Sequence, residues 1–220
     1  MNESVLALQA TLAEHLPWHG ARLNFLAQFL LALFKVRSVN LAELATGFGG
    51  KAQVASNDKR LQRFFHSFGI DYDVLARLLV HLFPVGEGPW YLILDRTNWK
   101  SGKTEINFLV LGIAGQGMAL PVMRAVLDQA GTSDTEERTA LLQRFVKQFG
   151  QTRIKALLAD REFVGGHWFA WLQAQGIPFH IRLKRNTLIP NAWNVPMRAD
   201  VRFGSLKPGQ SSHLQGRQPA

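Results

Sequence analysis

The order of hydrophobic and polar residues changes character once along the chain, at a short segment rich in proline and glycine. Before it, apolar residues recur every three or four positions, which is the spacing of helices that bury one face. After it, short apolar runs bounded by turn residues dominate, which is typical of strands. The segment, residues 84–89 (PVGEGP), therefore predicts a boundary between a helical N-terminal domain, residues 1–85, and a second domain.

Five helices are predicted before the boundary, and two of them have clear start signals. Asn40 with Glu43 three residues later is a helix N-cap pattern, and Asp71 is a second expected N-cap. The helix over 21–36 is apolar nearly all round and is expected at the centre of this domain. The predicted helices cover residues 3–16, 21–36, 40–44, 57–68 and 71–83.

The basic helix over 57–68 is the first candidate for contact with a ligand. Its apolar positions are expected to face inward, and its cations outward. Together with the short helix and glycine-rich turn before it, this helix loosely resembles a helix-turn-helix, which predicts DNA contact. An ordinary helical subdomain with a solvated basic face explains the pattern equally well. The inward set is Leu61, Phe64, Phe65 and Phe68, and the outward set is Lys59, Arg60 and Arg63.

After the boundary the predicted order of elements is β-β-β-α-β-α-β. A polar hairpin turn, 96–105, is expected between the first two strands, and the first helix is expected to begin with a Ser133–Glu136 capping box and to stop at Gly150. Beyond Thr187 the chain is expected to be irregular. The predicted strands cover 90–95, 106–115, 120–128, 152–160 and 177–186, and the helices lie within 131–150 and 161–176.

Two aspartates stand at the ends of the two strands with unbroken apolar runs. Asp95 follows WYLIL, and Asp160 follows IKALLA; such runs suit central strands covered on both faces. The order of elements indicates an α/β, RNase H-like mixed sheet, in which the first and fourth strands are parallel neighbours. The two carboxylates would then lie close together, which is unfavourable unless a cation lies between them. Hard oxygen ligands suit Mg²⁺ or Mn²⁺. Each aspartate alone would equally fit a turn or cap residue.

Composition and charge restrict the kind of partner and the cellular location that we expect. The chain has 220 residues, no cysteine and a net charge of +9, which indicates a polyanion such as nucleic acid as partner. The longest apolar helix candidate, 23–36, is shorter than the roughly 20 residues of a membrane span. No secretory signal is visible at the N-terminus. We therefore expect a cytoplasmic, nucleoid-associated protein without a membrane partner.

Two segments carry a resemblance to a known family. LDRTNWKSGKTEINFLVLGI and LLADREF resemble the segments around the first two catalytic aspartates of bacterial insertion-sequence transposases of the DDE class, in the branch typified by the IS-four elements. The resemblance implies nicking at transposon ends and strand transfer into target DNA, by an enzyme that can oligomerise on double-stranded DNA. It implies two metal ions held by Asp95, Asp160 and a third acid. Arg161 would contact a phosphate or carboxylate.

The third acid of the family is a glutamate on a later helix, in a Tyr-Arg-Glu-Lys type of motif. After Glu162 this chain has no glutamate, and its later acid is Asp200. We therefore expect a truncated and catalytically impaired copy, whose two carboxylates can still hold one metal weakly. Residues 86–187 would form an incomplete RNase H-like core, and residues 188–220 the start of a β-rich insertion that is cut short.

Two alternatives to an active transposase follow from the same residues. One is a non-catalytic fragment that binds DNA or inhibits the full-length enzyme. The other is a different RNase H-like nuclease, such as a junction resolvase or ribonuclease H, against which the DRTNW motif and the helical domain argue. In every case three further cations are candidates for phosphate contact: Lys100, Lys184 and Arg185.

Overall fold

A computed structural model describes residues 3–127, 133–191, 193 and 195–212. Its backbone packing divides the chain into two compact units, Met1–Pro84 and Val85–Ala220, and each is described separately. In the first unit the predicted caps at Asn40 and Asp71 are confirmed, since each side chain accepts hydrogen bonds from two backbone amides of the helix that follows. The helices are α1 (Glu3–His15), α2 (Gly20–Val36), α3 (Leu41–Gly47), α4 (Val54–Ser67) and α5 (Tyr72–Leu82).

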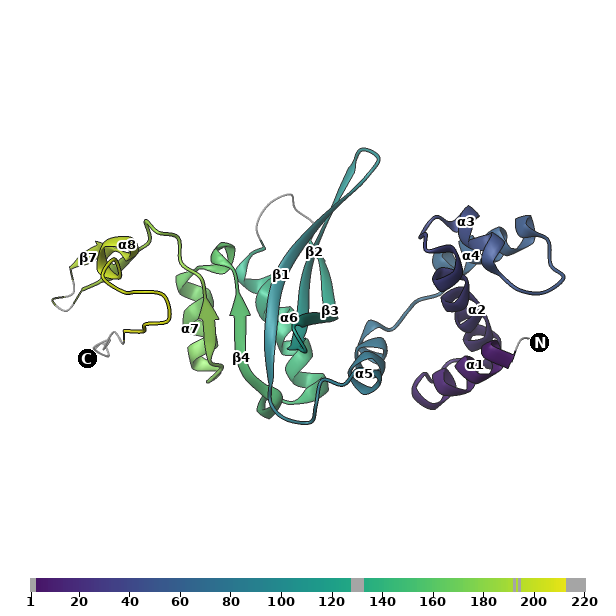
Figure 1. The fold of residues 1–220 in the computed structure, drawn as a ribbon, viewed down its shortest axis with the longest axis horizontal. Coiled ribbons are helices and arrows are strands. Elements are labelled where there is room, and N and C mark those ends of the chain that lie inside the picture. Colours follow the sequence, from purple (N-terminus) through teal and green to yellow (C-terminus); the bar gives the residue numbers. More distant parts are fainter. Residues whose placement is uncertain (1–2, 128–132, 192, 194, 213–220) are drawn as a thin grey trace. The chain divides into compact units, whose positions relative to one another are not determined.

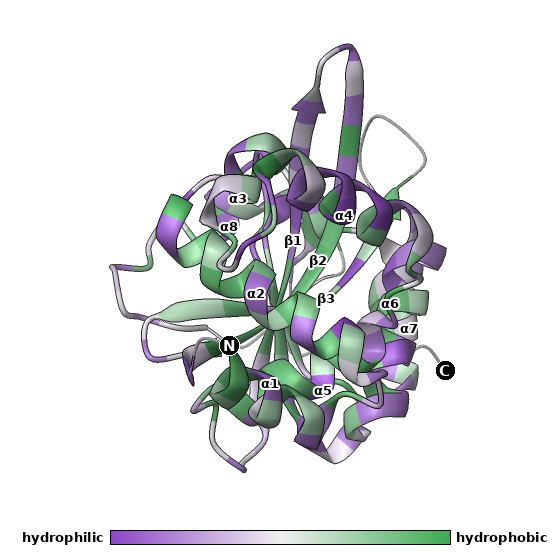
Figure 2. Ribbon diagram, turned by 90° about the vertical axis from the view of Figure 1, so that its right-hand side faces the viewer, coloured by the Kyte–Doolittle hydropathy of each residue, from purple (hydrophilic) through white to green (hydrophobic). Residues whose placement is uncertain are grey.

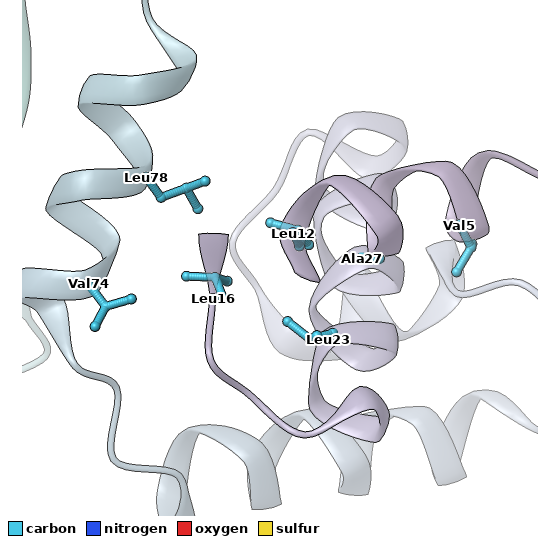
Figure 3. Packing of buried hydrophobic residues seen from close by; sticks show 7 residues of the cluster. All are labelled: Val5, Leu12, Leu16, Leu23, Ala27, Val74 and Leu78. Carbon is cyan, nitrogen blue, oxygen red and sulfur yellow. The ribbon is translucent and has the colours of Figure 1, made fainter. Parts of the chain in front are cut away.

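The first unit buries two clusters of apolar side chains on either side of α2. One joins α1, α2 and α5, and Figure 3 shows Val74 and Leu78 of α5 facing Leu12 and Leu16. The other joins α2, α3 and α4 around Phe25 and Leu61. The sequence-based orientation of α4 was wrong at Phe65, which is 45% exposed, because its helix position lies at the rim of this cluster.

The length of the apolar helices was also compared with that of a membrane span. Within the described residues no single helix has the length and apolar composition of a span. α2 and α3 meet that criterion together, as a pair bent by 100°.

The second unit is built on a mixed five-stranded sheet with the order β3-β2-β1-β4-β5, which confirms the RNase H-like fold class. β1 pairs antiparallel with β2 and parallel with β4, and β5 continues the sheet parallel to β4. Figure 1 shows this arrangement. The strands are β1 (Trp90–Ser101), β2 (Thr104–Gly115), β3 (Met118–Leu127), β4 (Ile154–Ala159) and β5 (Phe179–Ile181).

Two helices, α6 (Thr135–Phe149) and α7 (Gly166–Ala174), cover the same face of this sheet (Figure 1). Both belong to crossovers between parallel strands, and two right-handed crossovers that run in one direction put their helices on one face. On that face Phe145 of α6 is fully buried against Trp90 of β1, with the ring centroids 6.3 Å apart. The opposite face receives neither helix.

Three details differ from the sequence-based prediction. The capping box at the start of α6 is formed by Asp134 and Glu137, because the predicted cap, Ser133, is buried and bonded to Arg138. The segment predicted as a polar hairpin turn, 96–105, is mostly strand. The region after 187, predicted irregular, contains β6 (Leu188–Pro190), β7 (Pro196–Arg198) and α8 (Ala199–Arg202). The predicted strand end at 128 and helix start at 131–132 lie outside the described residues.

The β1–β2 hairpin extends beyond the rest of the sheet. The ladder to β4 ends at the pair Leu94↔Ala159, and the ladder to β3 ends at Asn107↔Leu127. Past these pairs β1 and β2 continue as a two-stranded ribbon, whose far end is mainly hydrophilic in Figure 2. Asp95 is therefore the first residue of β1 past its ladder to β4, and it still pairs with Val110 of β2.

Candidate active site

The two aspartates meet at one end of neighbouring parallel strands. In the β1–β4 ladder Ile93 lies beside Leu158 and Leu94 beside Ala159, so the next residue on each strand is Asp95 and Asp160, respectively. Neighbouring strands lie about 4.8 Å apart, which places the two carboxylates within reach of a common ion. The prediction that strands one and four are parallel neighbours is confirmed.

Both carboxylates project from the sheet face that α6 and α7 leave uncovered. Successive side chains of a strand alternate between faces. Leu92 and Leu94 are buried on the helix-covered face, so Asp95 points to the other; Leu157 is buried likewise, so Asp160 also points to the other. Both aspartates are exposed, which leaves them open to a substrate that approaches over this face.

The immediate partners of the aspartates are a backbone amide and an arginine. One Asp95 oxygen, Oδ1, accepts a hydrogen bond of 2.8 Å from the backbone N–H of Arg96. Asp160 Oδ1 lies 3.6 Å from Nη1 of Arg182, which follows β5. Because these side chains are at least half exposed, the ion pair contributes little to stability. Its charge nevertheless lies where a phosphate would approach.

The residues present fit part of a divalent-metal site. Carboxylate oxygens on adjacent strands are the hard donors that Mg²⁺ and Mn²⁺ prefer. Among the described residues no group of three or more acidic or histidine side chains is gathered closely enough to hold a metal ion. The remaining ligands of a six-coordinate ion would therefore be water, phosphate oxygens or a further carboxylate. Residues 163–191 contain no glutamate that could supply this carboxylate.

Glu162, the other acid of the second motif, does not join the pair of aspartates. Its Oε2 accepts a hydrogen bond of 3.0 Å from Nε of Arg96, whose side chain alternates to the helix-covered face. Neither Arg96 nor Arg182 was predicted from the sequence as a neighbour of the site. Arg96 could have been predicted from its place directly after Asp95, since the next residue of a strand points to the opposite face. The contact of Arg182 could not, because it depends on β5 pairing with β4.

The three basic residues predicted on α4 have different environments. Lys59 and Arg63 are exposed on the outer side of the helix. Arg60 is half-buried, and its guanidinium carbon lies 5.5 Å from the ring centroid of Phe25 and 6.0 Å from that of Phe48. Lys59 and Arg63 are thus available to a phosphate backbone, whereas Arg60 also packs on the core of its own unit.

The other predicted cations are exposed and lie around the sheet end that bears the aspartates. Lys100 stands near the tip of the β1–β2 ribbon, next to Trp99, whose side chain is 60% exposed and lies on the same face as Asp95 by strand alternation. Trp99 therefore does not pack under the hairpin. The remaining three are Arg161, Lys184 and Arg185.

The uncovered sheet face combines apolar and basic side chains. Tyr91 is 38% exposed and Val126 61% exposed on this face, and the Nζ of Lys155 lies 4.7 Å from the centroid of the Tyr91 ring. Exposed apolar side chains on a central sheet are a feature of surfaces that receive another element. A further group can therefore approach the two aspartates from this side.

Comparison with known families gives one match that spans this site. A family model described as the transposase DDE domain matches residues 86–209, which is more than half of the chain and includes both aspartates. No curated protein matches the chain.

Proposed function

The chain belongs to the family of transposases with a DDE domain, and from this premise we propose that Asp95 and Asp160 are its metal-binding catalytic residues for DNA strand cleavage and strand transfer. Members of this family act on DNA and generally use a divalent metal. The DRTNW and ADREF motifs support a place in the IS-four-like branch.

The observation that carries the proposal is the register of β1 and β4. It puts two carboxylates side by side on exposed ends of parallel strands, an arrangement whose mutual repulsion a cation relieves. A bound Mg²⁺ or Mn²⁺ would activate the attacking oxygen and stabilise the leaving oxygen of a phosphodiester. Asp95 and Asp160 would hold such an ion at the ends of these two strands, and Arg182 would attract the phosphate.

The third carboxylate of the family would have to reach the site across the uncovered sheet face. Both aspartates point to that face, and Tyr91 and Val126 leave apolar surface there for a helix to pack on. The glutamate that such a helix carries in the family is absent from residues 163–220. For the two carboxylates that these 220 residues bring together, we propose weak binding of a single metal ion and slow catalysis.

The affinity for Mn²⁺ tests this proposal directly. We expect the wild-type chain to bind Mn²⁺, and Asp95→Asn to weaken binding by about a hundredfold, since one negative charge next to the ion is lost. The free-ion signal in electron paramagnetic resonance measures the dissociation constant. Glu105→Gln, an exposed carboxylate on the same hairpin, serves as the matched control and should bind as the wild type does. Equal affinity in wild type and Asp95→Asn would contradict the proposal.

A second candidate function is that of a DNA-binding or inhibitory fragment without catalysis. The net charge of +9 and the two-carboxylate site favour it. DNA affinity in the presence and absence of Mg²⁺ separates the two functions. A site that joins metal to phosphate predicts tighter DNA binding with Mg²⁺ and no such gain in Asp95→Asn. A pure binder predicts the same affinity in all four measurements and a steep dependence on salt.

The basic face of α4 is proposed to contact the DNA backbone. Lys59→Gln combined with Arg63→Gln should flatten the plot of log affinity against log salt by about two, because each phosphate contact contributes roughly 0.9 to the slope. Fluorescence anisotropy with a labelled duplex at several salt concentrations gives the slope. Lys35→Gln, an exposed cation on α2, changes the charge without touching α4 and should leave the slope nearly unchanged. Equal slopes in all variants would place the DNA elsewhere.

A further inference from the structure

An ion pair links the two chain segments that bear the aspartates, on the side of the sheet opposite to them. Arg96 and Glu162 are 66 residues apart in sequence, and the Arg96 Nε lies 3.0 Å from Glu162 Oε2. Arg96 directly follows Asp95, and Glu162 lies two residues after Asp160. The pair thus connects the same two strand ends whose separation sets the geometry of the metal site.

The environment of this pair distinguishes it from an ordinary surface ion pair. The Arg96 and Glu162 side chains are 21% and 26% exposed, whereas the Arg182–Asp160 pair on the other face is 82% and 50% exposed. Partial burial reduces screening by water, so the attraction between the two groups is stronger than at the surface. Packing also restricts the rotamers of both side chains, which favours one geometry of the hydrogen bond from Arg96 to Glu162.

A second arginine, on α6, lies beside the residue that follows Glu162. Arg138 of α6 is buried, its guanidinium carbon lies 5.1 Å from the centroid of the Phe163 ring, and its Nε donates to Ser133 Oγ at 2.9 Å. Burial lowers the pKa of Arg138, and the charge of Glu162 opposes this shift. Glu162 therefore bonds to Arg96 of β1, and the next residue, the fully buried Phe163, packs against Arg138 of α6.

The direct backbone ladder between β1 and β4 stops just short of the aspartates. The β1–β4 ladder ends at Leu94↔Ala159, one residue before them, and two nearby carboxylates repel each other. Resting on the proposed metal site, we propose that the Arg96–Glu162 pair is a positioning device that fixes the spacing of Asp95 and Asp160. These residues act through the ligands and do not touch the metal or the DNA.

A mutant cycle on the full chain tests the device. Arg96→Gln, Glu162→Gln and the double variant should each weaken Mn²⁺ binding by about tenfold, as loss of a partner that orients metal ligands does. The double variant should be no weaker than either single one, because both remove the same link. Arg96→Lys should recover part of the affinity. Arg198→Gln, which breaks the Arg198–Asp200 ion pair of the same unit, is the matched control and should bind as the wild type does.

Three results would overturn the inference. If the Arg96 and Glu162 variants bind Mn²⁺ as the wild type does but melt at a lower temperature, the ion pair only stabilises the fold. Effects of the two single variants that multiply in the double variant would mean that Arg96 and Glu162 act independently. Tighter binding in Arg96→Gln would mean that the released Glu162 is itself a metal ligand.

Hydrogen exchange without metal separates failure of this inference from failure of the metal site. Arg96→Gln should speed amide exchange in residues 159–163, because the link that holds this segment to β1 is lost. If wild type and Asp95→Asn bind Mn²⁺ equally while this exchange rises, the proposed metal site is wrong and the link between the segments stands. Unchanged exchange overturns the positioning device, whatever the metal affinity is.

Discussion

Asp95→Asn and Asp160→Asn are each expected to lower the rate of metal-dependent DNA strand cleavage by at least about a thousandfold. Asparagine keeps the shape of aspartate, and its oxygen can still accept the Arg96 backbone N–H that Asp95 Oδ1 accepts at 2.8 Å. The local fold should therefore survive. What is lost is the negative charge that attracts the metal ion, and with the ion goes the stabilisation of charge on the scissile phosphate.

Conversion of supercoiled plasmid to nicked circles in Mg²⁺ or Mn²⁺ measures this rate. Glu105→Gln removes a carboxylate from the same hairpin and should cleave as the wild type does. Cleavage that continues in a metal chelator, or at the wild-type rate in both asparagine variants, would contradict the assignment of these residues. A wild-type chain that binds Mn²⁺ and DNA but cleaves nothing would favour the non-catalytic function, because the third carboxylate would then be indispensable.

The second large effect is expected from Phe145→Ala, which should destabilise the second unit by about 3–5 kcal/mol. Phe145 is fully buried, and its ring lies 6.3 Å from that of Trp90 and 4.9 Å from that of Phe149, measured between centroids. Truncation leaves a cavity between α6 and the start of β1. Since Asp95 follows Trp90 on the same strand, loss of this packing should weaken the frame of the site as well.

Urea denaturation followed by tryptophan fluorescence gives the change in the free energy of unfolding. Phe34→Ala makes the same chemical change at a side chain that is 78% exposed, and should stay within about 0.5 kcal/mol of the wild type. A loss below about 1 kcal/mol for Phe145→Ala would mean that α6 is not packed on the sheet as described.

The sequence was most informative where a structural rule is local. Unbroken apolar runs before Asp95 and Asp160 predicted central strands covered on both faces; both strands lie inside the sheet, but α6 and α7 cover one face and Tyr91 is exposed on the other. The caps at Asn40 and Asp71 were likewise predictable, because a capping side chain bonds to amides two or three residues away. Local patterns also placed Gly150 at the end of α6.

Predictions from pattern failed where long-range packing decides. The 96–105 segment has no apolar alternation, because from Trp99 onward β1 and β2 form a two-stranded ribbon that exposes both faces. Pairing from Arg96↔Leu109 to Ser101↔Thr104 makes it strand. Ser133 matched the capping pattern as well as Asp134 did. Its burial beside Arg138 took it out of that role, and nothing near it in sequence indicates this contact.

The sequence by itself determined the two aspartates, the order of elements and the motifs that mark the family, since each depends on residues close together along the chain. The tertiary structure alone decided which face of the sheet the carboxylates occupy, that Arg182 lies beside Asp160, and that Glu162 turns away to Arg96. The physical reason is that these contacts join segments far apart in sequence, and strand register and helix packing bring them together only in the folded chain.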